Sequence, residues 1–278
     1  FPLSRSVSSM LRSLVLRSSS TVARKQAQQR FTEELAIRHK HLAEKYEFRI
    51  ATMSDYDSLM YLSGDFIRDE PILATLKATA ENTRNLMDYV IRKCLIANDV
   101  SRYSHIVTEK STGNPVAYRI GQYSYRNPSD DPSPQIDLPK FNEIELSTIN
   151  ALDALYNKLW SIFPDEKAFF KVEIMAVKRE HRSTGLAQTL SFYGQDNQRI
   201  IKMGPVKYLA MVVTAHKTKM LSVRYGLETL ASSEKEIIGI DSQKVELKED
   251  RLMLKVLNLK ENESIDVKPF WKKMGLIE

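Results

Sequence analysis

Residues 170–187 constrain the fold more than any other stretch, because an apolar strand pattern runs into a short polar loop that opens a helix. The loop ends in Arg-x-x-Gly-x-Ala, formed by Arg182, Gly185 and Ala187. A strand-to-helix turn of this kind points several backbone N–H groups, and the positive end of a helix dipole, at one spot. The pattern therefore predicts a binding site for a pyrophosphate group.

Positive charge is concentrated at the start of the chain. The 278 residues carry a formal net charge of +6, and residues 1–32 contain six basic and no acidic side chains. The folded body is therefore close to neutral and lacks a basic stripe with interleaved aromatics, which argues against nucleic-acid binding. No run approaches the ~18 consecutive apolar residues of a membrane-spanning helix, so no membrane span is expected.

The same N-terminal composition bears on localisation. Residues 1–45 form a basic extension and a charged lead-in helix, and the extension is rich in Arg and Ser. That composition is typical of a mitochondrial transit peptide, but it also fits a basic tail on a cytoplasmic protein. We expect three parts: this extension at 1–45, one catalytic-type domain at 46–260 and a tail at 261–278.

The hydrophobic pattern predicts a mixed α/β domain built around one sheet. A short strand at 47–51 precedes a helix capped by Thr52 or Ser54, which ends at Asp69-Glu70-Pro71. The elements expected after this break are a helix at 80–96, a hairpin at 103–125, a loop at 126–140, a helix at 141–162, a strand at 169–177, a helix at 185–201, a strand at 208–213, a helix at 215–224 and a strand at 251–259.

This order, with the 182–187 loop at its centre, resembles the GNAT superfamily of N-acetyltransferases over about residues 47–260. Two further segments resemble the arylalkylamine N-acetyltransferases of the insect dopamine type. Phe66-Ile-Arg-Asp-Glu-Pro-Ile72 is similar to that family's Phe-x-x-Asp-Glu-Pro-Leu, and Val213-Thr-Ala-His-Lys-Thr-Lys219 is similar to its Cys-Ser-Ser-His-Tyr-Ser-Ala. Alanine at 215 and Lys217 depart from the family pattern, which puts the substrate in doubt more than the chemistry.

The resemblance implies the acyl-CoA N-acyltransferase (GNAT) fold, a mixed central sheet with splayed strands flanked by helices. Strands 169–177 and 208–213 would splay apart and admit acetyl-CoA as co-substrate. Backbone groups of Ala176 and Val177 would contact the pantetheine arm and the thioester. The residues expected around the pyrophosphate are Arg182, Ser183, Thr184, Gly185, Leu186 and Ala187.

The chemistry adds its own requirement, since an alkyl ammonium with a pKa near 10.4 must lose a proton before it attacks a thioester. Glu70 matches the family's proposed base, and repulsion from Asp69 would raise one pKa of the pair. Thr214 and Thr218 stand at the family's two serines, and Thr218 is a candidate hydroxyl near the leaving thiolate. Phe66, Tyr123, Tyr125 and Phe192 are candidates for an aromatic substrate pocket by residue type alone.

The resulting hypothesis is an acetyl-CoA-dependent N-acetyltransferase that moves an acetyl group to a small primary amine by direct attack. An acetyltransferase for a polyamine, an amino acid or a protein lysine remains open, as does a non-catalytic acyl-CoA-binding module. No metal site is expected, because no His or Cys cluster has ligand spacing and the single cysteine, Cys94, fits a helix core. The sequence does not predict the oligomeric state.

Overall fold

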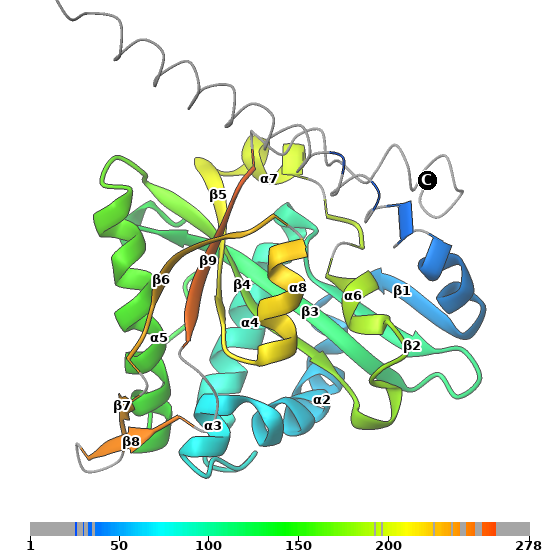
Figure 1. Ribbon diagram of the computed structural model, residues 1–278, viewed down its shortest axis with the longest axis horizontal. Coiled ribbons are helices and arrows are strands. Elements are labelled where there is room, and N and C mark those ends of the chain that lie inside the picture. The colour runs from blue at the N-terminus through cyan, green and yellow to red at the C-terminus, as the bar shows by residue number, and fades with distance from the viewer. Residues whose placement is uncertain are drawn as a thin grey trace, which may run out of the picture.

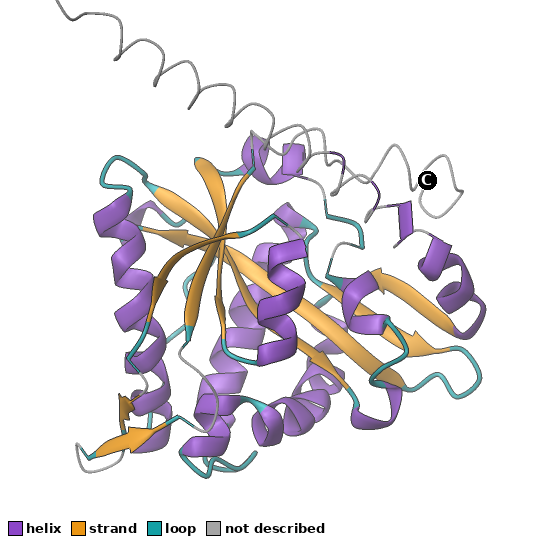
Figure 2. Ribbon diagram, viewed as in Figure 1, coloured by secondary structure: helices purple, strands orange, loops and turns teal. Residues whose placement is uncertain are grey.

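A mixed sheet with helices on both faces forms the centre of the protein (Figure 1, Figure 2). The computed structural model describes residues 26, 30, 33–34 and 37–259, apart from 192, 196, 225, 235, 240–242 and 248–251. Within these residues the strands lie across the sheet in the order β1 (Tyr46–Ile50), β2 (His105–Glu109), β3 (Pro115–Tyr125), β4 (Ala168–Val177), β5 (Val206–Val213), β9 (Met253–Asn258) and β6 (Glu228–Ser232). A separate small hairpin is formed by β7 (Glu236–Ile238) and β8 (Lys244–Glu246).

Each face of the sheet has its own set of helices. One face is covered by α2 (Tyr56–Asp69), α3 (Pro71–Thr75), α4 (Arg84–Ser101) and α5 (Glu143–Ile162). The other is covered by α6 (Leu186–Leu190), α7 (Asn197–Met203) and α8 (His216–Arg224). Three short 3₁₀ turns complete the connections, at η1 (Met53–Asp55), η2 (Pro128–Asp130) and η3 (Arg179–His181). The central strands β3 and β9 have nearly continuous buried runs, because successive side chains point into opposite layers, as expected for a sheet covered on two sides.

A bulge in β4 changes which face its side chains meet. The register with β3 passes from Gly121–Val172 to Ile120–Ile174, which leaves Glu173 as the extra residue. Val172 packs in the layer of α7 and α8, whereas Ile174, two positions later, packs in the layer of α2 and α4. Bulges of this kind re-aim side chains and are common beside active sites.

The strands β4 and β5 pair only at their beginnings. Among the described strands theirs is the one parallel pairing, and its register runs from Ala168–Val206 to Lys171–Ala210. Beyond that point β4 continues to Val177 and β5 to Val213 without pairing to each other. The two strands therefore splay apart, as the sequence predicts, and a gap opens between them (Figure 1).

One predicted helix, at 185–201, is wrong, because the chain forms two shorter helices there, α6 ending at Leu190 and α7 beginning at Asn197. Arg119 on β3 explains the break. Its guanidinium is 1% exposed and donates to the carbonyl oxygens of Leu190, Ser191 and Tyr193 at 2.7, 2.7 and 3.0 Å. These carbonyls lie at and beyond the end of α6, so the buried arginine takes the acceptors that a continuing helix would use.

The remaining elements largely agree with the sequence. The mixed α/β class and the other predicted helices and strands are confirmed, with ends that shift by a few residues. The strands β6, β7 and β8 were not predicted from the sequence. Phe192 and residues 1–25 and 260–278 lie outside the described residues, so the transit peptide and the domain limits stay predictions.

Residues 37–45 are helical and lie beside β1 (Figure 1). We call this segment the lead-in helix. His39 is its most buried side chain, 3% exposed, and it packs between the rings of Phe48 and Tyr193 at centroid distances of 4.7 and 5.0 Å. Burial lowers the pKa of His39 to about 4, so the imidazole is neutral in the folded protein at pH 7.

Replacing Arg119 by Met should lower the free energy of unfolding by about 3 kcal/mol or more, since each buried carbonyl left without a donor costs roughly 1–3 kcal/mol. Urea unfolding followed by circular dichroism measures the difference. Arg126→Met is the control, because Arg126 donates to three carbonyls, those of Trp160, Phe163 and Glu166, against four for Arg119, but is exposed. Water can replace its bonds, so equal losses in the two variants would contradict the role given to burial.

The pH dependence of stability should reflect His39. Its folded pKa lies below the ordinary 6.5, so below pH 6.5 the unfolded chain binds a proton that the folded chain does not, and stability falls as pH falls from 6.5 toward 4. The slope from one such group is on the order of 1 kcal/mol per pH unit. His39→Gln should reduce the slope of the unfolding free energy against pH by about that amount between pH 6.5 and 5. An unchanged slope would show that His39 does not titrate as described.

Candidate active site

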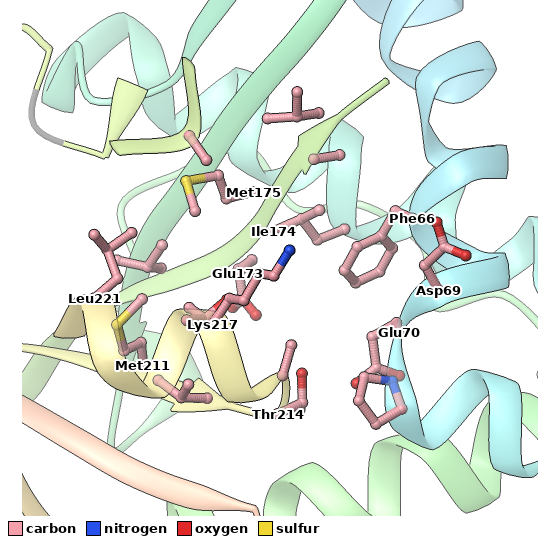
Figure 3. Close-up of a pocket in the computed structure, with 18 of the residues that line it drawn as sticks. Phe66, Asp69, Glu70, Glu173, Ile174, Met175, Met211, Thr214, Lys217 and Leu221 are labelled. Carbon is pink, nitrogen blue, oxygen red and sulfur yellow. The ribbon is translucent and has the colours of Figure 1, made fainter. Parts of the chain in front are cut away.

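A cavity of about 770 Å³ opens where β4 and β5 part. Figure 3 shows Phe66 and Glu70 on one side of this cavity and Met211 and Lys217 on the other. Of the residues predicted for the site, those that line the cavity are Glu70, Ala176, Val177, Arg182, Ser183, Thr184, Gly185, Ala187, Thr214 and Thr218. The exception is Leu186, which is 1% exposed and packs in the core under α6. The fold thus brings together segments that lie more than 100 residues apart in the sequence.

The loop from β4 to α6 has the backbone conformation that a tight turn demands. Ser183 and Gly185 both have positive φ, 65° and 95°, and Gly185 is the N-cap of α6. A positive φ is strained for a side chain such as that of Ser183 and easy for glycine. Inside the loop the Thr184 hydroxyl donates to the His181 carbonyl at 2.8 Å, and His181 Nδ1 lies 2.9 Å from the Tyr46 hydroxyl. The loop is therefore braced against β1 as well as within itself.

Asp69 ties this loop to the end of α2. Its carboxylate accepts from Arg182 Nη1 at 2.5 Å and from Arg179 Nη2 at 3.0 Å. Burial alone would raise the pKa of Asp69, but the hydrogen bonds and charges of Arg182 and Arg179 outweigh it and hold that pKa below its ordinary value. Of the acidic pair, Asp69 is therefore not the residue whose pKa is raised, and the expectation that repulsion raises one pKa of the pair stays a prediction for Glu70. Arg182 also donates from Nε to the Val177 carbonyl at 2.9 Å, which fixes the loop to the end of β4.

Glu70 has a different environment from its neighbour. It is 8% exposed and serves as the N-cap of α3, where its Oε2 accepts from the backbone N–H of Leu73 at 2.8 Å. Pro71 occupies the first position of that helix, where a missing N–H costs nothing. The break at Asp69-Glu70-Pro71 thus does more than end a helix, because the new helix start holds the Glu70 carboxylate at the cavity wall (Figure 3).

The two predicted hydroxyls lie where β5 leads into α8. Thr214 follows the last residue of β5 and Thr218 lies in the first turns of α8, and both line the cavity. Of the aromatic candidates, Phe66 lines the cavity, whereas Tyr123 is 7% exposed in the core and donates to the Ile200 carbonyl at 3.2 Å. Tyr125 packs against the same core.

Three charged residues of the cavity, Arg38, Glu173 and Lys217, were not predicted as site residues from the sequence. Glu173, the bulge residue, accepts from Gln122 Nε2 at 2.8 Å, and Lys217 of α8 lies across the cavity from Glu70 (Figure 3). Arg38 of the lead-in helix also lines the cavity, next to the 182–185 loop. A strand bulge leaves no signal in a hydrophobic pattern, and nothing in the sequence predicts where the lead-in helix docks. Lys217 was noticed only as a departure from the family pattern.

Metal and thiol chemistry have little support in the described residues. Among them no group of three or more His, Cys, Asp or Glu side chains is placed to hold a metal ion. Cys94 is fully buried in the α4 core, and burial raises the pKa of its thiol. No described helix is long and apolar enough to cross a membrane.

Comparison with solved structures identifies the fold. Arylalkylamine N-acetyltransferase 2 from Aedes aegypti superposes with a TM-score of 0.59 at 14% identity, over 77% of this chain and 99% of that one. The chain has the fold of the GNAT acetyltransferases. The C-terminal condensation domain of Ebony, solved with β-alanyl-dopamine, gives a TM-score of 0.60 at 12% identity, again over 77% and 99%.

A third similar structure is a polyamine N-acetyltransferase from Drosophila melanogaster that forms N-acetylagmatine. It superposes with a TM-score of 0.53 at 12% identity, over 77% of this chain and 99% of that one. Comparison of the sequence with protein families and with curated proteins finds no match. At these identities the likeness establishes the fold, and the activity has to be argued from the site.

Asp69→Asn should loosen the 178–185 loop, because it removes the charge that Arg179 and Arg182 share. The loop amides should exchange with deuterium about fivefold faster, the factor that roughly 1 kcal/mol produces. Hydrogen exchange read by mass spectrometry measures this. Glu180→Gln is the control, since among the described residues the ion pair of Glu180 is with Lys178, at the exposed side of the loop. Unchanged exchange in Asp69→Asn would mean that the ion pairs do not hold the loop.

Proposed function

We propose that this protein is an N-acetyltransferase that transfers the acetyl group of acetyl-CoA to a small primary amine by direct attack. One observation carries the proposal. The Glu70 carboxylate, suited to an amine, and the glycine-containing 182–187 turn, suited to a pyrophosphate, open into the same cavity from opposite segments of the chain. A cavity with only one of these features would support binding but not transfer.

The open edge of β4 supports the co-substrate assignment. Beyond Lys171 this edge has no strand partner in β5, so its backbone groups can pair with an extended ligand arm as they would with another strand. Ala176 and Val177, at the end of β4, would hold the arm, and the loop after them would hold the pyrophosphate. Acetyl-CoA supplies an activated acyl group as a thioester, which a neutral amine attacks without further activation.

Glu70 is suited to accept the proton of the attacking amine. Its bond from the Leu73 N–H fixes the orientation of the carboxylate, and its position at the start of α3 keeps the group at the wall of the cavity. An amine arrives mostly as its ammonium ion at pH 7, so a carboxylate both attracts it and removes a proton, directly or through water. Thr218 and Thr214 line the same cavity and are the proposed hydroxyl groups near the thiol that leaves.

Two features of the cavity favour different amines. Phe66, Met211 and Leu221 give it apolar walls that suit an arylalkylamine (Figure 3). Glu173 adds a second carboxylate, which suits an acceptor with a second positive charge such as a polyamine. The similar structures include enzymes of both kinds by their names. The arylalkylamine class remains the first proposal, and a polyamine is the second candidate.

Glu70→Gln should lower kcat/KM by about 100-fold, within the range that general bases contribute, while the affinity for CoA stays the same. The amide oxygen of Gln can still accept from the Leu73 N–H, so the helix cap survives. A panel of arylalkylamines, polyamines and amino acids with acetyl-CoA, read by release of free thiol, measures the rates.

Glu173→Gln is the matched control. It changes a second carboxylate of the same cavity and should alter the preference among amines more than the maximal rate. If the unmodified protein binds CoA but turns over no amine in the panel, it is a binding module and the enzyme proposal is wrong. If turnover is present and Glu70→Gln leaves it unchanged, only the assignment of the base is wrong.

A further inference from the structure

The lead-in helix is fixed to the folded body at several points. His39 lies between Phe48 and Tyr193, and Leu42, 8% exposed, packs in the same core cluster as Val177 and Leu186. Val177 ends β4 and Leu186 begins α6, so this cluster lies directly under the loop between them. The helix is thus held in place by the same apolar layer that supports the loop.

The C-terminal end of the helix is fixed by the β2–β3 turn. Lys110 donates from Nζ to the Ala43 carbonyl at 2.6 Å and from its backbone N–H to the Lys45 carbonyl at 2.9 Å. These bonds satisfy carbonyls at the last turn of a helix, where backbone acceptors have no intrahelical donor. With His39 and Leu42 buried and this end fixed, the direction of the helix is determined.

The docked lead-in helix brings Arg38 against the 182–187 loop. A Cβ added to Gly185 would meet Arg38 Cδ at 2.5 Å and Arg38 Nε at 3.4 Å. The aliphatic stem of Arg38 therefore lies in the space that a side chain at 185 would fill, and the absence of a Cβ permits this approach. Arg38 lines the same cavity as Arg182, Ser183 and Gly185. Glycine at 185 thus allows both the positive φ of the turn and the close approach of the Arg38 side chain.

The charges around the loop distinguish Arg38 from its neighbours. Arg179 and Arg182 both pair with Asp69, and Lys178 pairs with Glu180. Within the part of the chain that the structure describes, Arg38 has no carboxylate within ion-pair distance. A guanidinium that is half-buried beside a turn of backbone N–H groups is well placed for a phosphate, to which arginine binds with two parallel hydrogen bonds.

We propose that Arg38, supplied by the lead-in helix, binds the pyrophosphate of CoA together with the 182–187 loop. This inference rests on the proposed function, because it assumes that CoA occupies the cavity. It makes the lead-in helix part of the cofactor site and extends that site beyond the sequence segments that carry the family resemblance. Arg182, already paired with Asp69, then mainly shapes the loop, and Arg38 supplies charge to the ligand.

The test compares Arg38→Gln with the unmodified full-length protein. Gln keeps part of the aliphatic stem over Gly185 and removes the charged end of the side chain. The dissociation constant for CoA, measured by calorimetry, should rise about tenfold, as expected for loss of a charged hydrogen-bonding partner. Dephospho-CoA, which keeps the pyrophosphate, should show the same loss, and S-acetylpantetheine, which has no phosphate, should show none. Arg38→Lys should recover part of the affinity.

Lys40→Gln is the matched control, because Lys40 is an exposed cation on the same helix. It should leave the CoA affinity within about twofold. Equal CoA affinity in Arg38→Gln and the unmodified protein would overturn the proposal while leaving the proposed function intact. A loss seen with CoA but not with dephospho-CoA would overturn the assignment to the pyrophosphate. If the unmodified protein binds no CoA, the proposed function fails and this inference fails with it.

Discussion

The site depends on the fact that the pairing between β4 and β5 stops before either strand ends. Parallel strands normally satisfy each other's backbone groups along their shared length, yet here the register stops at Lys171–Ala210 while both strands continue. Backbone groups left open inside a protein are costly unless they meet water or a ligand. The bulge at Glu173 lies just beyond the last pair and turns the rest of β4 to different neighbours. The cavity is therefore a direct result of the sheet, and an extended ligand can complete it.

Asp69 and Glu70 link the two halves of that cavity. Because the two residues are consecutive, the ion pairs that hold Asp69 to Arg179 and Arg182 also fix the backbone of Glu70 relative to the loop. The cap of α3 then fixes the Glu70 side chain. The distance between Glu70 and the 182–187 turn is thus set by a contact between two residues that lie 113 positions apart in the sequence. This contact explains how Asp69-Glu70-Pro71 and the 182–187 loop, far apart in the sequence, form one site.

The sequence predicted the parts of the site that depend on local chemistry. Gly185 and its loop, the helix break at Pro71 and the end of β5 before Thr214 each leave a signal within a few residues, and the structure places them at one cavity. It could not predict what depends on distant partners. Arg119 breaks the helix predicted at 185–201 by binding carbonyls 71 to 74 residues away. The position of a polar residue in a strand does not predict which distant carbonyls accept its hydrogen bonds. The ion pair between Asp69 and Arg182 could not be predicted for the same reason.

The arginines and the carboxylates that line the cavity come from different elements of the fold. Arg38 and Arg182 line the cavity at the loop, whereas Glu70 and Glu173 line it from the start of α3 and from β4, with Lys217 of α8 across the cavity from Glu70. An anionic ligand end would therefore be drawn to the loop, and a cationic group to the walls that carry the two carboxylates. Asp69 also lines the cavity, but its charge is balanced by arginines, so it competes less with Glu70 for an ammonium group. If the proposed function holds, the anionic CoA and the cationic amine are guided to different walls of one cavity, and the acyl group and the amine meet between the splayed strands.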